Sequence, residues 1–170
     1  LMKPSTSSSN SEPLSLTIIC LNEADNIADC IQSVPFASEV LVMDSGSTDG
    51  TIEICEQLGA KVIQQEWLGF GKQKQKVVDL AQHDWVLCLD ADERLSEALQ
   101  DSILSFLENP DANACKMPRC NHFLGRWLRH GEGYPDHNLR LYNRHHAHWS
   151  DDPVHEHVIT SVPVKTLKGD

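Results

Sequence analysis

The feature that most constrains the fold is an alternation, over the first 108 residues, of short apolar runs with segments of helical periodicity. The apolar runs cover residues 15–21, 40–43, 61–63 and 85–89. Runs that stay apolar at every position fit strands buried on both faces, as in a parallel sheet. Repeated alternation of such strands with helices is typical of βαβ units. We therefore expect an α/β fold with an open, mostly parallel sheet and helices on both faces.

Helices are expected between these strands, because apolar residues there recur at three- and four-residue spacing. The patterned segments are 27–34, 51–58, 77–81 and 96–107. Asn22 is the predicted N-cap of the first helix and Ser96 that of the last. Gly59 is the predicted glycine just after the second helix, and Pro110 is the predicted stop of the fourth.

Outside this region the pattern is weaker. The Ser-rich residues 1–13 lack an apolar period and are expected to be a disordered lead. Segments 112–117 and 138–143 are predicted strands, and the Gly-containing stretch 119–136 is a predicted loop. Residues 14–170 are expected to form one domain, which ends without a closing element and is therefore predicted to be truncated at the C-terminus.

The net charge argues against nucleic acid as a partner, and the charge distribution differs between the two parts of the chain. The formal net charge is −11, which is unsuited to the phosphate contacts of a nucleic-acid-binding protein. Residues 1–110 hold six Lys and Arg against eighteen Asp and Glu, whereas residues 111–170 hold eight against seven and eight of the nine histidines. Two surfaces with different tasks are expected. The six cysteines form no C-x-x-C pair, so we expect reduced thiols and a cytoplasmic chain.

Polar residues collect where the predicted strands end. Asn22-Glu23 follows the first strand, residues 44–50 follow the second, and residues 90–93 (Asp-Ala-Asp-Glu) follow the fourth. Ligands of open parallel sheets bind outside the carboxyl ends of the strands, where these clusters would meet. Loops favour the same residue types for conformational reasons alone. Three such clusters at one edge nevertheless favour a functional site.

The acidic edge predicts a phosphate-bearing ligand held through a metal ion. The chain has no G-x-G-x-x-G after the first strand and no P-loop sequence. Asp90 and Asp92 follow a buried strand and offer hard oxygen ligands, with Asp44 at a neighbouring strand end. Mg²⁺ and Mn²⁺ bind through carboxylates together with substrate phosphates, so either ion is the expected cofactor.

Three motifs in this order resemble the family 2 inverting glycosyltransferases, which have the Rossmann-like GT-A fold. They are Leu21-Asn22-Glu23, Asp44-Ser45-Gly46-Ser47-Thr48-Asp49-Gly50-Thr51 and Asp90-Ala91-Asp92-Glu93. The resemblance covers about residues 14–158 and is closest to the lipopolysaccharide-core glucosyltransferase subgroup. The subgroup's Gly-x-Gly-x-Gln-Lys-Asn stretch corresponds to residues 69–75, with Gln75 in place of Asn. Its R-L-[FY] and V-H-E elements resemble Arg140-Leu141-Tyr142 and Val154-His155-Glu156.

The resemblance implies that residues 14–110 bind a nucleotide-sugar donor. The residues implied for that site are Leu21, Asn22, Glu23, Asp44, Ser45, Lys74, Asp90 and Ala91. Leu21 and Glu23 would contact the nucleoside, and Asp44 would accept a hydrogen bond from the base. Lys74 would lie near the ribose or diphosphate. Asp90 and Asp92 would hold Mg²⁺ or Mn²⁺, which stabilises the leaving diphosphate.

Residues 111–170 would form the acceptor side. Inversion needs a base that takes the proton of the acceptor hydroxyl, and the candidates are Glu156, Asp151, Asp152 and His155. The V-H-E likeness favours Glu156, and we retain Asp152 as a second predicted catalytic residue. Arg140 and His155 are predicted acceptor contacts. The arginines of this part fit an anionic acceptor and also fit ordinary surface charge.

The predicted activity is metal-dependent transfer of a sugar, with inversion, from a nucleotide-diphosphate donor such as UDP-glucose. The expected acceptor is a glycan or glycolipid of the lipopolysaccharide inner core. A peripheral contact with the inner membrane surface is compatible with such an acceptor. The alternative is a nucleotide-sugar-binding fragment without turnover. A haloacid-dehalogenase-like phosphatase fits poorly, because Gly46 stands where that motif needs a second Asp. His145, His146 and His148 are more simply explained by a solvated loop than by a metal site.

Overall fold

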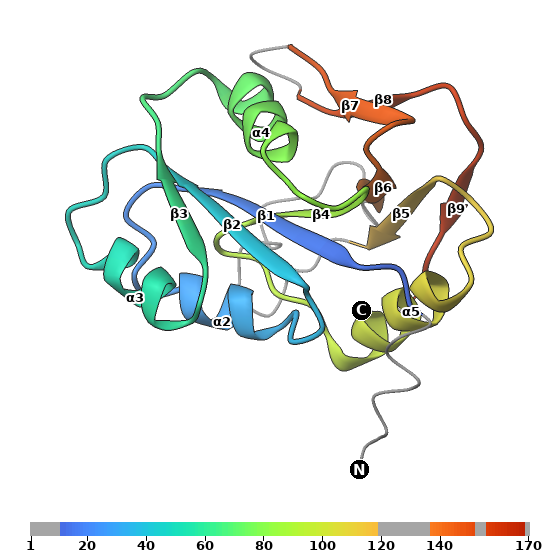
Figure 1. The fold of residues 1–170 in the computed structure, drawn as a ribbon, viewed down its shortest axis with the longest axis horizontal. Helices are drawn as coiled ribbons and strands as arrows, with labels where there is room; N and C mark the ends of the chain where they lie inside the picture. Colours follow the sequence, from blue (N-terminus) through green and yellow to red (C-terminus); the bar gives the residue numbers. More distant parts are fainter. Residues whose placement is uncertain (1–10, 119–136, 152–155, 169–170) are drawn as a thin grey trace, which may run out of the picture.

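A computed structural model describes residues 11–118, 137–151 and 156–168 of the chain. One seven-stranded sheet forms its centre, in the order β3-β2-β1-β4-β6-β5-β9 (Figure 1). Its parallel half consists of β1 (Leu14–Cys20), β2 (Glu39–Asp44), β3 (Lys61–Gln64) and β4 (Trp85–Asp90). The predicted parallel sheet is therefore confirmed, and each of its four predicted strands is present.

The other half of the sheet changes direction. The strand β6 (His137–Asn143) runs antiparallel to β4, and β5 (Ala114–Pro118) runs antiparallel to β6. The strand β9 (Val164–Thr166) pairs in parallel with β5 at the edge. A separate two-stranded sheet joins β7 (Ala147–Trp149) to β8 (Val158–Thr160). The sequence predicted β5 and β6 but not the three short strands that follow.

Helices cover both faces of the sheet, as expected (Figure 1). The helices α2 (Ile27–Gln32), α3 (Thr51–Gln57) and α5 (Glu97–Glu108) lie on one face, where their apolar residues pack with Leu16, Ile18 and Leu87. The helix α4 (Phe70–Asp79) lies on the other face, where Val77 and Val78 share a core with the opposite side of β1, β2 and β4. Alternate residues of each central strand thus enter two separate cores.

Three of the four predicted helix boundaries are confirmed and one is wrong. The helix α5 ends at Glu108, shortly before the predicted stop at Pro110. Ser96 caps α5, since its side chain accepts a hydrogen bond from the Leu99 amide at 3.1 Å. Gly59 follows α3 with φ of 87°, as a glycine after a helix should. Asn22 does not cap α2, which begins at Ile27 after Asn26. It has a left-handed φ of 55° and fastens the next loop instead.

The lead expected over residues 1–13 and the loop expected over 119–136 fall mainly outside the described residues. Within the first segment, the amide of Glu12 donates a hydrogen bond to the carbonyl of Leu107, at the end of α5. Across the ranges given above, no helix has both the length and the apolar character needed to cross a bilayer. The described cysteines are all buried and form no disulfide with one another.

Candidate functional site

A cleft of about 560 Å³ opens at the carboxyl ends of β1, β2 and β4. The carboxylates of Glu23, Asp90, Asp92 and Glu156 line it, together with Leu21, Ser45 and Ala91 from the predicted donor site. Four different segments of the chain supply these residues, and the topology brings them to one edge of the sheet. The structure therefore gathers most of the residues that the sequence singled out into one cavity.

Two predicted donor residues, Asn22 and Asp44, instead build the loops around the cleft. The Asn22 side chain accepts a hydrogen bond from the Thr48 amide at 2.8 Å, and the Asn22 amide donates to the Ser47 hydroxyl at 2.7 Å. Asp44 is fully buried, and its carboxylate accepts from the amides of Gly46 and Ser47 at 2.9 and 2.8 Å. Asn22 thereby joins the loop after β1 to the loop after β2, and the Asp44 carboxylate holds the loop after β2 in place.

These hydrogen bonds also set the charge state of Asp44. Burial by itself raises the pKa of the Asp44 carboxyl, but the hydrogen bonds from the Ser47 hydroxyl and from the Ser47 and Gly46 amides outweigh it. The net pKa of Asp44 is lowered, so the group is a carboxylate at neutral pH. Its neighbour Cys20, which donates to the same carboxylate at 3.3 Å, has a raised pKa because of burial and that hydrogen bond.

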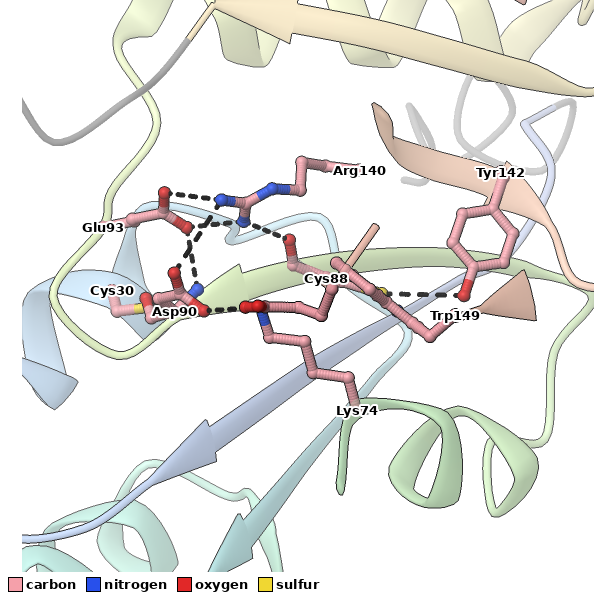
Figure 2. Close-up of polar contacts among 9 residues, drawn as sticks. Cys30, Lys74, Cys88, Asp90, Glu93, Arg140, Tyr142 and Trp149 are labelled. Atoms are coloured by element: carbon pink, nitrogen blue, oxygen red, sulfur yellow. Dashed lines mark hydrogen bonds and ion pairs between the residues drawn. The ribbon is translucent and has the colours of Figure 1, made fainter. Parts of the chain in front are cut away.

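The acidic turn after β4 is held from inside by an ion pair (Figure 2). Arg140 on β6 donates to both carboxylate oxygens of Glu93, at 2.7 and 2.9 Å, and to the carbonyl of Cys88 at 3.0 Å. Glu93 in turn accepts a hydrogen bond from the amide of Asp90 at 2.8 Å. The turn that presents Asp90 and Asp92 to the cleft is therefore fixed to β6 as well as to β4.

This pair is buried, which changes the interpretation of Arg140. The side chains of Arg140 and Glu93 are 9% and 3% exposed. Burial raises the pKa of Glu93, and the guanidinium of Arg140 opposes that effect. The Arg140 nitrogen that donates to Glu93 Oε2 also lies 3.8 Å from an Asp90 oxygen. The guanidinium expected to meet the acceptor thus faces the acidic turn, where it offsets the charge of two carboxylates.

Lys74 of α4 lies between two carboxylates of the cleft, those of Asp90 and Glu156. Its ammonium nitrogen is 3.1 Å from Glu156 Oε2 and 3.4 Å from Asp90 Oδ1. It also lies 4.5 Å from the centre of the Trp149 ring, in a cation–π contact. The side chain is 9% exposed, so little water screens these charges. Lys74, a predicted donor residue, lies beside Asp90 (Figure 2) and links it to Glu156, the predicted base.

An aromatic pair at the cleft was not predicted from the sequence. The rings of Trp67 and Phe70 meet edge to face with centroids 4.8 Å apart, and both line the cleft. The residues are 50% and 48% exposed, which is unusual for two neighbouring large aromatic side chains. They follow β3, on the opposite flank of the cleft from β6. The Trp-Leu-Gly-Phe sequence before α4 was the available signal, but no periodicity distinguishes such a pair from core residues.

The remaining residues singled out in the sequence are two predicted site residues and the three histidines of the expected solvated loop. Asp152 and His155 lie outside the described residues. His145, His146 and His148 are exposed, and His145 pairs with Asp84 at 2.8 Å, which agrees with a solvated turn.

The described residues fit a divalent ion that is shared with a substrate. Within them, no group of three or more His, Cys, Asp and Glu side chains is arranged to hold a metal by itself. Asp90 and Asp92 nevertheless place two carboxylates in one cleft. Mg²⁺ and Mn²⁺ are commonly bound by one or two carboxylates, with water and substrate phosphates completing the coordination shell. This donor set suits an ion that arrives with a diphosphate.

Solved structures of other proteins share the fold of this chain. Mannosyl-3-phosphoglycerate synthase from Rubrobacter xylanophilus matches with a TM-score of 0.56 and 23% identity, over 69% of this chain and 44% of that one. Glucosyl-3-phosphoglycerate synthase from Mycobacterium tuberculosis, solved with Mn²⁺ and UDP, matches with a TM-score of 0.54 and 22% identity, over 65% and 45%. The fold is that of the GT-A glycosyltransferases.

A family model narrows the class. The model described as glycosyl transferase family 2 matches residues 15–162, and the chain belongs to this family. A lipopolysaccharide core biosynthesis glycosyltransferase of Rhizobium meliloti, LpsC, is 30% identical over 86% of this chain and 57% of its own length. A glycosyltransferase of Rickettsia felis is 53% identical over 54% of this chain and 33% of its own. The chain thus spans between a third and about half of these relatives.

Proposed function

We propose that the chain catalyses metal-dependent transfer of a sugar, with inversion, from a UDP-sugar to a glycan acceptor. The observation that carries this proposal is the shared cleft, in which Asp90 and Asp92 from the donor side face Glu156 from the acceptor side. UDP-glucose is the proposed donor, supported by the UDP and Mn²⁺ of the similar glucosyl-3-phosphoglycerate synthase. Lipopolysaccharide inner core is the proposed acceptor, supported by the name of LpsC. A glycolipid acceptor of this kind would bring the chain to the inner membrane surface.

On the donor side, Asp90 and Asp92 would hold Mg²⁺ or Mn²⁺ against the diphosphate. The ion, when bound, offsets the negative charge that develops on the leaving group. Leu21, Glu23 and Ser45 lie at the ends of β1 and β2 and would contact the nucleoside. The Arg140–Glu93 pair would keep the acidic turn in place, so that no reorganisation is needed as charge develops.

On the acceptor side, Glu156 would accept the proton of the attacking hydroxyl. The Lys74 ammonium lies 3.1 Å from Glu156 Oε2 and would hold the carboxylate in one orientation for that step. Glu156 is partly buried, which limits competition from water while leaving one side on the cleft. Asp152 is the alternative base and His155 the proposed acceptor contact.

Calorimetric titration of UDP tests the metal and donor assignments together. We expect UDP affinity in Mn²⁺ to fall at least tenfold when the ion is removed with chelator. Asp92→Asn should produce a similar loss in saturating Mn²⁺, because it removes one charged ligand. Asp101→Asn, an exposed change on α5, is the matched control and should bind as the native chain does. UDP affinity that is indifferent to chelator would exclude the metal-dependent site.

A second candidate function is donor binding without turnover. It is supported by the cleft residues Leu21, Glu23 and Ser45, which would hold a donor whether or not Glu156 acts as a base. Release of UDP from UDP-glucose, measured with a coupled assay, separates the two functions. Turnover that Glu156→Gln abolishes while UDP affinity is unchanged supports the transferase, since a base acts only in the transition state. Tight UDP binding with no turnover supports the binding role.

A further inference from the structure

The helix α4 touches the segment after β7 without any side chain between the two backbones. Gly71 is buried in the first turn of α4, and a Cβ placed there would overlap the carbonyl oxygen of Ser150. The Ser150 carbonyl carbon would lie only 3.0 Å from that Cβ. Glycine is the only residue that fits this contact, although it is disfavoured inside helices by about 1 kcal/mol relative to alanine. The close approach therefore has a specific structural use.

Two further residues on the same side of α4 continue the contact. Gln75, one turn after Gly71, accepts a hydrogen bond from the Trp149 amide at 2.7 Å. Lys74 lies over the Trp149 ring and pairs with Glu156. Positions 71, 74 and 75 are three and four residues apart and so share one face of the helix. That face, which we term the α4 mount, is defined by Gly71, Lys74 and Gln75.

Ser150, which the α4 mount contacts, is hydrogen-bonded to His157, the residue next to the proposed base Glu156. The Ser150 amide donates to the His157 carbonyl at 2.7 Å, and the His157 amide donates to the Ser150 hydroxyl at 3.1 Å. Glu156 is the residue immediately before His157. Any displacement of Ser150 from α4 is therefore transmitted to Glu156 through two hydrogen bonds and one peptide unit.

The same helix also contacts the donor side of the cleft. The Gln73 side chain, which is fully buried, donates to the Ser45 hydroxyl at 3.0 Å. Ser45 and Glu156 both line the cleft, on the donor and acceptor sides respectively. One helical turn thus holds residues of both sides, and the distance between them depends on how closely α4 approaches Ser150.

We propose that Gly71 and Gln75 are positioning residues that fix Glu156 opposite the donor carboxylates. This inference rests on the proposed function, because it assigns the mount a role in placing the base. Neither residue needs to touch substrate. Their effect is on the distance between base and donor, and misplacement of a catalytic group by about 1 Å costs on the order of a hundredfold in rate.

The first experiment substitutes Gly71 by alanine and uses Lys76→Ala, at an exposed position of α4, as the control. The rate of UDP-glucose hydrolysis and the UDP affinity in Mn²⁺ are measured for each. We expect Gly71→Ala to lower kcat at least tenfold while the UDP dissociation constant changes less than twofold. Lys76→Ala should change neither. A Gly71→Ala protein with native kcat would overturn the proposal.

The second experiment tests the Gln75 hydrogen bond by loss and rescue. Both substitutions are made in an Asp79→Asn background, because the Gln75 side chain contacts the Asp79 carboxylate at 2.7 Å and a glutamate there would be repelled. Gln75→Met removes the acceptor for the Trp149 amide, whereas Gln75→Glu keeps an acceptor. We expect Gln75→Met to lower kcat and Gln75→Glu to restore it. Equal effects of the two changes on kcat would indicate a merely structural role for Gln75 and would overturn the proposal.

Hydrogen exchange provides a readout that does not depend on catalysis. The Trp149 amide should exchange at least tenfold faster in Gly71→Ala and Gln75→Met than in the native chain, with the Leu87 amide of β4 as internal reference. Native exchange at Trp149 in both variants would overturn the mount. A different outcome is possible, in which the Trp149 amide exchanges faster in the variants but the native chain does not hydrolyse UDP-glucose. That outcome would overturn the proposed function, whereas the contact between the α4 mount and Ser150 would stand.

Discussion

Substitution of Arg140 by methionine tests whether the acidic turn depends on the ion pair beneath it. The change removes two hydrogen bonds to Glu93 and one to the Cys88 carbonyl, and it leaves the Glu93 carboxylate in a site only 3% exposed. Removal of one partner of a buried pair costs about 3–5 kcal/mol. In a chain of this size, each kcal/mol lowers the melting temperature by about 2–4 °C. We therefore expect a fall of about 6–20 °C.

A double-mutant cycle in urea separates the pair from the packing around it. Glu93→Leu alone should also be strongly destabilising, because it removes the acceptor of the Asp90 amide. The Arg140→Met/Glu93→Leu double variant should be less destabilised than the sum of the two single changes by about 0.5–3 kcal/mol, as residues in one network are. Arg94→Met, at a half-exposed ion pair with Asp29, is the control and should cost no more than about 1 kcal/mol. A loss below 1 kcal/mol in Arg140→Met, or additive single changes, would refute the reasoning.

Two further predictions concern the aromatic pair and the loop carboxylate. Trp67→Ala should weaken UDP binding by about 1–3 kcal/mol, the usual contribution of stacking on a base. Leu80→Ala, at an exposed position at the far end of α4, is the control and should leave UDP binding unchanged. Unchanged UDP affinity with weaker UDP-glucose affinity in Trp67→Ala would indicate that the pair contacts the sugar. Because the folded-state pKa of Asp44 is lowered, its stabilising contribution is present above its unfolded pKa of about 3.9 and is lost as pH falls through the folded value. Asp44→Asn should therefore make the urea unfolding midpoint less dependent on pH between pH 5 and pH 2. A midpoint that varies with pH as much as that of the native chain would contradict this.

The parallel half of the fold could be predicted because burial on both faces leaves a continuous apolar run. The strands β1, β2 and β4 follow this rule, and their observed bounds agree with the predicted ones within one residue. Ser96 was identifiable because a capping hydroxyl acts on an amide three residues away, within reach of local sequence. Local signals of this kind also placed the acidic clusters at strand ends, and the topology then brought them together.

The contacts of the site were less predictable, since they depend on residues far apart in sequence. Nothing in a local window shows that Arg140 pairs with Glu93, 47 positions away, or that Lys74 reaches Glu156, 82 positions away. The acceptor role of Arg140 stays a prediction, and its pairing with Glu93 follows from the packing of β6 against β4. The predicted cap at Asn22 was wrong because it was also judged from local sequence. Its side chain bonds to Thr48 in the neighbouring loop, and this tertiary contact replaced the expected local cap.

The strand order has a consequence for the way the chain is assembled during synthesis. The strand β6 lies between β4 and β5, although it follows β5 in the chain, so a gap beside β4 stays open until residues 137–143 have been made. Until then β4 is an unpaired edge, which is a template for aggregation. The same delay keeps Arg140 away from the acidic turn. A ribosome-bound chain would therefore hold a nearly complete donor half in which Glu93 still lacks its guanidinium partner.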